Sequence, residues 1–283
     1  MNRSDLMNAL EIKDLTKEYK GFKLDNLSLT LPTGCIMGLI GENGAGKSTT
    51  INSILGLKKY DHGTIKVLGQ DMNAELKQDI GVVLDEVGIP QALNIKNVRS
   101  VMKNIYSNWD DKAFGDYVKK FSLPDNKKFS DFSKGMKMKL AIAIALSHNA
   151  KLLILDEPTS GLDPLVRDEI IDILNDFTRD EGHSILISSH IVSDLEKLCD
   201  YIAFLHKGKL MLCEEKDVLL ERYRFINATE EQLSELDPDA IKGKKTGKFS
   251  TEAIVDQELI PANFRTAPIT IEDLFVFMAK EEN

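Results

Sequence analysis

Eight consecutive residues limit the possible folds of this chain more than any other feature. They form a glycine-rich segment with a lysine and a serine at its end: Gly41, Glu42, Asn43, Gly44, Ala45, Gly46, Lys47 and Ser48. Glycines at this spacing permit backbone angles that let successive N–H groups point at phosphate oxygens. Lys47 adds a positive charge, and the hydroxyl of Ser48 is a suitable ligand for Mg²⁺. The segment therefore predicts a phosphate-binding loop.

The residues on either side of the loop have the pattern that such a loop requires. Residues 35–40 are a continuous apolar run typical of a buried strand, and residues 48–55 have helical spacing. A helix that begins at the loop points the positive end of its dipole at a bound phosphate. We therefore expect a strand, a loop and a helix that bind ATP, and we include Thr49 among the nucleotide-binding residues.

A second apolar run ends in two acids. Residues 152–155 are apolar, and Asp156 and Glu157 follow them. Ligands of open α/β sheets bind at the carboxyl ends of the strands, so both acids are expected to face the phosphates. Asp156 suits a water-mediated hold on Mg²⁺, while Glu157 is placed to orient or deprotonate an attacking water. Acidic strand ends are common by themselves, but with the loop they predict hydrolysis.

The rest of the chain predicts an α/β fold followed by a small α+β appendage. Residues 95–146 look helical, and residues 165–179 form a helical segment between two apolar strands, as in a parallel sheet. Other expected strands are at residues 10–13, 27–31, 64–68, 80–84, 184–187, and in a hairpin at 201–205 and 210–213. We expect the main domain to cover residues 1–222.

The appendage, residues 223–283, contains three local signals. Thr229 begins a capping box, residues 243–248 read as a basic turn, and residues 270–278 predict a capped amphipathic helix. Such a helix is more often a docking or core element than a ligand site. No chemistry is assigned to this part of the chain.

Composition limits the cellular compartment and the binding partners to be expected for this chain. The net charge of −9 gives no electrostatic reason to expect a nucleic-acid partner. The three cysteines, Cys35, Cys199 and Cys213, lack metal-ligand spacing and are expected to be reduced, as in the cytosol. Residues 1–6 lack the apolar run of a secretion signal, and no stretch approaches the ~18 apolar residues of a membrane span. Any membrane role is therefore expected to need a partner.

Residues 156–163, Asp-Glu-Pro-Thr-Ser-Gly-Leu-Asp, resemble the continuous Walker B motif and D-loop of ATP-binding cassette (ABC) ATPases. Further features of that family follow in the family's order over residues 8–222. Tyr19 resembles the adenine-stacking aromatic of the A-loop, residues 132–136 (Phe-Ser-Lys-Gly-Met) resemble the signature motif, and His190 resembles the switch histidine. The resemblance implies a P-loop NTPase fold with a RecA-like parallel sheet, an antiparallel β subdomain and a helical signature subdomain, at about residues 86–147.

Each of these added positions also has a simpler interpretation. A lone strand aromatic such as Tyr19 is more often part of a core. A lone histidine is usually a surface or core residue, although the Ser-Ser that precedes His190 after an apolar strand favours a switch. Ser133 by itself would be interpreted as a helix cap, whose N–H groups can also meet an anion.

The resemblance also implies an assembly. In the family, the signature of one subunit faces the phosphate loop of another, so Ser133, Gly135 and Asp163 are expected to contact nucleotide held by a second ABC ATPase subunit. ATP then closes the pair of subunits, and hydrolysis opens it. The second subunit is expected to be a copy of this chain or a related chain.

Two departures from the family pattern stand out. Lys134 and Met136 occupy signature positions where the commonest form has Gly and Gln. Asp85, followed by Glu86, stands where the family's Q-loop glutamine reaches Mg²⁺ and the membrane partner. A carboxylate at Asp85 is expected to approach the metal through water, with altered charge.

The signature and the short cassette resemble the ATPase subunits of bacterial drug and antimicrobial-peptide exporters. This implies ATP hydrolysis that drives export through separate permease subunits, at the cytoplasmic face of the membrane. One alternative is a soluble ABC ATPase of translation or DNA maintenance, but the chain has neither two cassettes nor a long inserted coiled coil. A phosphotransferase is a second alternative, for which the sequence shows no acceptor site.

Overall fold

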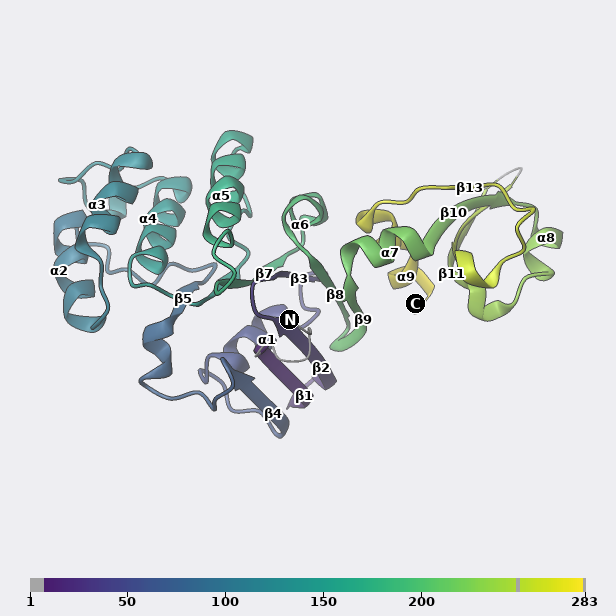
Figure 1. The fold of residues 1–283 in the computed structure, drawn as a ribbon, viewed down its shortest axis with the longest axis horizontal. Helices are drawn as coiled ribbons and strands as arrows, with labels where there is room; N and C mark the ends of the chain where they lie inside the picture. The colour runs from purple at the N-terminus through teal and green to yellow at the C-terminus, as the bar shows by residue number, and fades with distance from the viewer. Residues whose placement is uncertain (1–7, 248–249, 282–283) are drawn as a thin grey trace.

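The computed structural model describes residues 8–247 and 250–281 (Figure 1). The segment at residues 1–6, on which the expectation of no secretion signal rests, lies outside the described residues. So does Lys248 of the predicted basic turn.

A six-stranded sheet forms the centre of the fold, in the order β5-β6-β7-β3-β8-β9. Its strands are β3 (Ile36–Ile40), β5 (Ile80–Val83), β6 (Leu152–Asp156), β7 (Ser184–Ser189), β8 (Tyr201–His206) and β9 (Lys209–Glu215). Strands β5, β6, β7, β3 and β8 are parallel, and β9 pairs with β8 in the antiparallel sense. Because the carboxyl ends of parallel strands lie on the same side of the sheet, the residues that follow β3, β6 and β7 lie close together.

Both faces of this sheet are covered, which explains why its strands are apolar throughout. Every residue of β3, β6 and β7 is buried. Alternate side chains of a strand enter different cores. In β3, Ile36 and Ile40 belong to one hydrophobic cluster, whereas Met37 and Leu39 belong to another.

One face is covered by α1 (Lys47–Ile54) and by an antiparallel sheet in the order β2-β1-β4. The strands of this second sheet are β1 (Asn8–Tyr19), β2 (Phe22–Pro32) and β4 (His62–Val67). Alternating side chains of β1 and β2, such as Leu10, Ile12, Leu27 and Leu29, pack with Ile51 and Ile54 of α1. The strands predicted at residues 10–13, 27–31 and 64–68 are therefore present, and they pack α1 against the central sheet.

The other face is covered by helices that extend to one end of the molecule (Figure 1). They are α2 (Ile95–Ile105), α3 (Asp111–Lys120), α4 (Lys134–Leu146), α5 (Pro164–Phe177) and α6 (Val192–Leu198), with the 3-10 turn η3 (Phe129–Asp131). Another 3-10 turn, η2 (Leu76–Asp79), precedes β5, and its Leu76 packs in the cluster on the α1 side. Asn94, Asp110, Ser133 and Asp163 cap α2 to α5 through side-chain oxygens. The predicted helical stretch at 95–146 thus consists of three capped helices.

The last part of the chain forms a third sheet at the opposite end (Figure 1). After α7 (Lys216–Arg222), the sheet has the order β11-β12-β10-β13. Its elements are β10 (Tyr223–Ala228), α8 (Glu230–Ser234), η4 (Pro238–Ala240), β11 (Ile241–Thr246), β12 (Thr251–Asp256), η5 (Gln257–Leu259), β13 (Thr266–Ala267) and α9 (Ile271–Glu281). Arg222 ties α7 to this sheet through bonds of 2.7 Å from both Nε and Nη2 to the fully buried Asp256 carboxylate.

One local prediction in this part is wrong. Residues 243–246 were expected in a basic turn, but they belong to strand β11. The reason is that Gly243 serves packing, since a Cβ at this position would lie 2.7 Å from the carbonyl oxygen of Phe277 in α9. The lysines that follow are exposed on an edge strand, where charge discourages pairing with other chains.

Within residues 8–247 and 250–281, no helix combines the length and apolar character needed to cross a bilayer. Cys35, Cys199 and Cys213 all lie within the described residues, and no disulfide joins them, as expected for reduced thiols. Burial raises the pKa of Cys213 to about 11.

Candidate active site

The glycine-rich loop lies between β3 and α1, as predicted, and forms one wall of a cavity of about 410 Å³. The cavity is lined by Phe22, Glu42, Asn43, Gly44, Gly46, Lys47, Ser48, Thr49, Asp85 and Glu157. Gly46 precedes α1 with a φ of 115°, an angle that other residues rarely adopt. A Cβ on Gly41 would lie 2.5 Å from the carbonyl oxygen of Leu205. Glycine is therefore needed both to turn the loop and to seat it on β8.

Lys47 is held in place by backbone carbonyl groups of the loop. Its side chain is only 6% exposed, and Nζ donates to the carbonyl oxygens of Gly41 at 2.7 Å and Glu42 at 3.3 Å. The same Nζ lies 3.1 Å from Oε1 of Glu157. The ammonium is thus fixed at the N-terminus of α1, where its positive charge adds to that of the helix dipole.

Glu157 follows β6 and contacts Lys47 of α1, Ser188 of β7 and His190, which follows β7. Its φ of 52° is in the left-handed region, an uncommon conformation for a residue other than glycine that costs about 1–3 kcal/mol. Its N–H donates to the carbonyl oxygen of Ser188 at 3.1 Å, which holds the strained turn. Its second carboxylate oxygen, Oε2, lies 2.7 Å from Nδ1 of His190 and accepts from the His190 backbone at 3.3 Å. The turn directs this carboxylate into the cavity.

The two acids at the end of β6 have different surroundings. Asp156 is buried, and its Oδ1 accepts a hydrogen bond of 2.5 Å from the Ser188 hydroxyl on the neighbouring strand β7. Glu157 lines the cavity, whereas Asp156 is not among the lining residues. The sequence singled out residues 188–190 only for the histidine, so this contact of Ser188 was missed, although the register of β6 and β7 makes it possible.

Asp85 follows β5 and lines the same cavity as the loop. The adjacent Glu86 instead lines two neighbouring cavities. Of the two acids that stand in place of the family's glutamine, the structure thus brings Asp85 to the loop.

Phe22 lies at the loop, and Tyr19, the aromatic residue to which the sequence pointed, lies beside Phe22 but does not line the cavity. Tyr19 is 40% exposed at the end of β1, and its ring centroid lies 6.4 Å from that of Phe22. Phe22 lines the cavity and also packs near Gly46. The signal for Phe22 was its position three residues after Tyr19, because the two residues pair directly across the β1–β2 hairpin.

The signature residues lie elsewhere. Ser133, Gly135 and Asp163 line a different cavity, of about 260 Å³. Ser133 caps α4 by accepting from the Met136 N–H at 3.2 Å, and Asp163 caps α5 by accepting from the Val166 N–H at 3.1 Å. Among the described residues, none lines both this cavity and the one at the loop. A single chain therefore does not bring its signature to its own phosphate loop.

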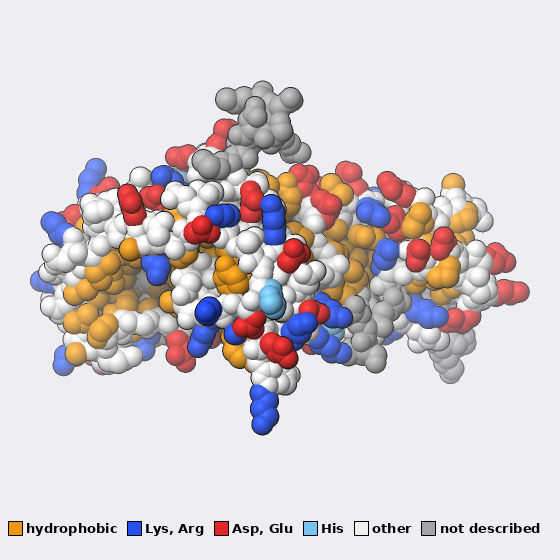
Figure 2. Space-filling model, turned by 90° about the horizontal axis from the view of Figure 1, so that it is seen from below, with side chains coloured by type: hydrophobic (Ala, Val, Ile, Leu, Met, Phe, Trp, Pro, Cys, Tyr) orange, Lys and Arg blue, Asp and Glu red, His pale blue; other side chains and the backbone are white. Residues whose placement is uncertain are grey.

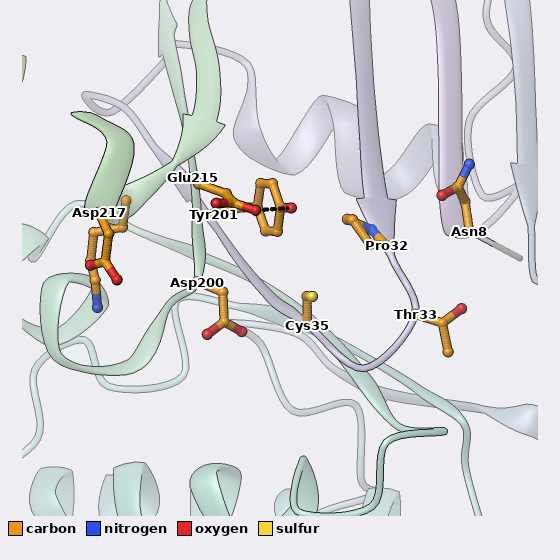
Figure 3. Close-up of a pocket in the computed structure, with 9 residues that line it drawn as sticks. Asn8, Pro32, Thr33, Cys35, Asp200, Tyr201, Glu215 and Asp217 are labelled. Carbon is orange, nitrogen blue, oxygen red and sulfur yellow. Dashed lines mark hydrogen bonds between the residues drawn. The ribbon is translucent and has the colours of Figure 1, made fainter. Parts of the chain in front are cut away.

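A further cavity, of about 390 Å³, lies at the opposite edge of the central sheet. Cys35 and Asp200, which line it, precede the first residues of β3 and β8 (Figure 3). Two of its three acidic groups take part in the fold: Glu215 accepts from the Tyr201 hydroxyl at 2.8 Å, and Asp200 accepts from the Ile36 N–H at 2.8 Å. This cavity lies apart from the phosphate loop.

Known proteins share both the sequence pattern and the fold. The ABC transporter family model matches residues 24–160. The lantibiotic transport ATP-binding protein SrtF of Streptococcus pyogenes is 37% identical over 211 residues, which are 74% of this chain and 91% of SrtF. The bacitracin transport ATP-binding protein BcrA of Bacillus licheniformis is 35% identical, over 73% of this chain and 69% of that protein.

A third relative extends into the C-terminal sheet. The ABC transporter ATP-binding protein YtrB of Bacillus subtilis is 28% identical over 94% of this chain and 97% of its own length. Among solved structures, the ATP-binding subunit of an ABC transporter matches with a TM-score of 0.69 and 28% identity, over 75% of this chain and 92% of that one. These likenesses confirm the predicted fold class and favour a transport ATPase over a soluble ABC ATPase. The chain belongs to the ABC transporter ATP-binding proteins, which are the ATP-hydrolysing, nucleotide-binding subunits of transporters.

Proposed function

We propose that this chain hydrolyses MgATP in the cavity at the phosphate loop and uses the energy to drive export through a separate membrane permease. The observation that carries the proposal is the convergence of Lys47, Glu157 and His190 at one edge of the central sheet, with distances of 3.1 Å and 2.7 Å. A cation for phosphate and a carboxylate for water are the two requirements of phosphoryl transfer to water.

The order of events follows from the Lys47–Glu157 ion pair. The γ-phosphate of ATP offers Lys47 a stronger anionic partner, so binding draws the ammonium away from the carboxylate. Glu157 keeps its contact with His190 and the backbone restraint at its own N–H. Its freed oxygen accepts a proton from the attacking water, and His190 orients the carboxylate.

The residues present fit a magnesium ion. The Ser48 hydroxyl and the Asp85 carboxylate line one cavity, and Mg²⁺ prefers oxygen ligands of these kinds. Asp156, held by Ser188, is placed behind them for a contact through water. When bound, Mg²⁺ supplies charge neutralisation at the phosphates.

We propose that a second ABC ATPase subunit completes the site. Ser133, Gly135 and Asp163 form their own cavity in this chain, away from the loop. The exposed N-terminus of α4 there offers N–H groups and a helix dipole to a phosphate held by another subunit. The cassette on this proposal is residues 1–222, with a helical part at about 86–147, and residues 223–283 form an accessory domain.

The permease is proposed to dock beside α2. A groove of about 280 Å³ is lined mainly by apolar residues between β5 and α2, among them Val83, Val87 and Met102. Val101 and Ile105 of α2 are 41% and 54% exposed. Figure 2 shows hydrophobic side chains gathered at the end of the molecule that α2 to α4 form. Such a patch suits a partner. We propose that a permease docked there holds the chain at the cytoplasmic face of the membrane.

The cargo class is proposed from the relatives. SrtF and BcrA are named for lantibiotic and bacitracin transport, and they match this chain across the cassette. We therefore propose a peptide antibiotic or a similar drug as the exported substrate.

A subunit-mixing experiment tests the composite site. Lys47→Ala disables the loop, and Gly135→Asp places a negative charge at the signature. A Cβ on Gly135 would be 3.4 Å from Val166, an ordinary contact, so the substitution is compatible with the fold. If the sites are shared between two copies, mixing the inactive variants restores one intact site and therefore ATP turnover. Turnover that stays at the sum of the separate variants contradicts a site shared between copies of this chain.

Membrane retention tests the transport role. The wild-type chain is expected to remain with membranes that contain its permease, whereas Val101→Asp together with Ile105→Asp should release it. Glu221→Gln, at an exposed position of α7, is the control. Recovery of the wild-type chain with ribosomes or DNA instead, or transfer of the γ-phosphate to a metabolite, would contradict the proposal.

A further inference from the structure

His190 lies in a short connection between strand β7 and helix α6. Strand β7 ends at Ser189, and α6 begins at Val192 after its N-cap residue, Ile191. The Ile191 N–H donates to the Ser189 hydroxyl at 2.9 Å. Because two residues separate the strand from the helix, the position of α6 decides where His190 meets Glu157.

Helix α6 depends on its neighbours for its position. It has seven residues, fewer than an isolated helix needs to be stable in water. Against β3, Leu195 packs closely, since a Cβ on Gly38 would lie 3.2 Å from Leu195 Cδ1. Against α5, Asp194 Oδ2 lies 3.5 Å from Nε of Arg167. Further packing on α6 comes from α9.

Helix α9 belongs to the C-terminal part of the chain but shares the core of the cassette. Ile271 and Leu274 are fully buried in the same hydrophobic cluster as Leu195 and Leu198 of α6. The ring of Phe275 lies 5.4 Å from that of Phe204 in strand β8 of the central sheet. Figure 1 shows α9 beside α7, between the central sheet and the C-terminal sheet. The helix predicted to be a docking or core element thus docks onto α6.

The other side of α9 is fixed to the C-terminal sheet. Strand β11 approaches its backbone at Gly243, where no side chain would fit against Phe277. The Phe277 ring meets Phe225 of β10 edge to face, with centroids 6.2 Å apart. Helix α9 is therefore held at both sides, and it connects the C-terminal sheet to the helix that follows His190.

We infer that α9 is a positioning element for His190 and that Phe275 is its principal positioning residue. This inference rests on the role proposed above for His190 in hydrolysis. Phe275 acts by holding α9, and through it α6, at the distance that lets His190 orient Glu157. Residues 223–283 thereby contribute to the rate of hydrolysis without touching the nucleotide.

A double-mutant cycle on the full chain tests this inference. Phe275→Ala is compared with Val276→Ala, which alters the next side chain, 38% exposed on the same helix. Each change is made in the wild-type chain and in His190→Ala, and phosphate release is measured in single-turnover and steady-state assays. Phe275→Ala is expected to lower kcat by about three- to tenfold, less than the ~100-fold that a 1 Å misplacement costs, with KM for ATP unchanged. Val276→Ala is expected to leave both constants unchanged.

Comparing the wild-type and His190→Ala backgrounds distinguishes a positioning role of Phe275 from a purely stabilising one. If Phe275 acts through His190, its loss lowers kcat no further in the His190→Ala chain. An equal loss in both backgrounds overturns the inference. So does a normal kcat for Phe275→Ala where His190→Ala is impaired, and that result leaves the proposed function standing. An unimpaired His190→Ala chain overturns the proposed role of His190 together with the inference.

A second variant keeps the test decisive if Phe275→Ala unfolds. Phe275→Leu retains apolar bulk and is expected to keep the wild-type melting temperature within a few degrees. In the same double-mutant cycle, Phe275→Leu should lower kcat in the wild-type chain but not in the His190→Ala chain. A loss of the same size in both backgrounds overturns the inference.

Discussion

The ammonium of Lys47 lies 3.1 Å from a carboxylate oxygen of Glu157, and the two side chains are only 6% and 13% exposed. Each group thus neutralises the other in a place where an unpaired charge is costly. On the proposed mechanism, phosphate binding separates the pair, because a phosphate in the loop competes with the Glu157 carboxylate for the Lys47 ammonium. The relationship links nucleotide binding to the release of the residue proposed to activate water.

Glu157→Gln is expected to slow phosphate release by about 10²-fold or more, as does the loss of a positioned base. ATP affinity should be at least that of the wild-type chain, since Lys47 no longer has a carboxylate competitor. Size-exclusion chromatography with ATP should show an accumulated closed dimer. Glu221→Gln, an exposed carboxylate on α7, serves as the control. Unchanged turnover in Glu157→Gln would remove Glu157 from the mechanism.

Lys47→Ala is expected to weaken nucleotide binding itself. A hydrogen bond from a charged group contributes about 1.5–3 kcal/mol, which corresponds to a roughly ten- to hundredfold higher Kd. Calorimetric titration with ATP measures the change, and Lys58→Ala, an exposed lysine just after α1, is the comparison. Equal affinities for the two variants would contradict the role of Lys47.

Tyr19→Ala and Phe22→Ala are expected to differ in their affinity for inorganic triphosphate, although both should bind ATP more weakly. Tyr19 is exposed at the edge of the site, so its loss should cost adenine stacking alone, about 1 kcal/mol or roughly fivefold in Kd for ATP. Phe22 also supports the loop, because its Cζ lies 3.1 Å from the position of a Cβ on Gly46. Inorganic triphosphate should therefore bind normally to Tyr19→Ala and more weakly to Phe22→Ala. The reverse pattern would exchange the two roles.

Stability is expected to fall in mild acid because of His148. This residue is fully buried, stacks on Tyr106 with ring centroids 3.9 Å apart, and donates from Nδ1 to the Gln78 carbonyl oxygen at 3.0 Å. Its Nε2 has no hydrogen-bond partner among the described residues, so protonation there would create a stranded buried N–H. Burial lowers the pKa of His148 from its usual value near 6.5, and the backbone hydrogen bond to Gln78 only partly opposes this.

The sign of the effect follows from this shift. Between the lowered pKa and 6.5 the unfolded chain binds more protons, so stability is complete above 6.5 and is lost as the pH falls below it. Urea unfolding at pH 7.5 and pH 5.5 measures the difference. His148→Gln should reduce the pH dependence, whereas the exposed His62→Gln should not. An equal pH dependence in all three chains would assign the effect to other groups.

Local sequence patterns were sufficient for the parts of the site that lie on continuous segments. The strand, loop and helix around Lys47, and the apolar strand that ends at Glu157, were predicted because parallel strands bring their carboxyl ends to one edge. Residues 243–246 were predicted wrongly, since a glycine among lysines signals a turn locally. In the structure this glycine makes room for a helix that lies more than thirty residues further along the chain.

The sequence by itself determined the phosphate loop, the acids at the strand end and the family, because each depends on residues close together in the chain. Tertiary structure alone decided that Lys47 pairs with Glu157, that Asp85 rather than Glu86 lies at the loop, and that α9 packs on the helix after His190. It also separated the signature from the loop of the same chain. The physical reason is that distances between distant segments depend on how side chains fill the cores between sheets and helices, which no local pattern specifies.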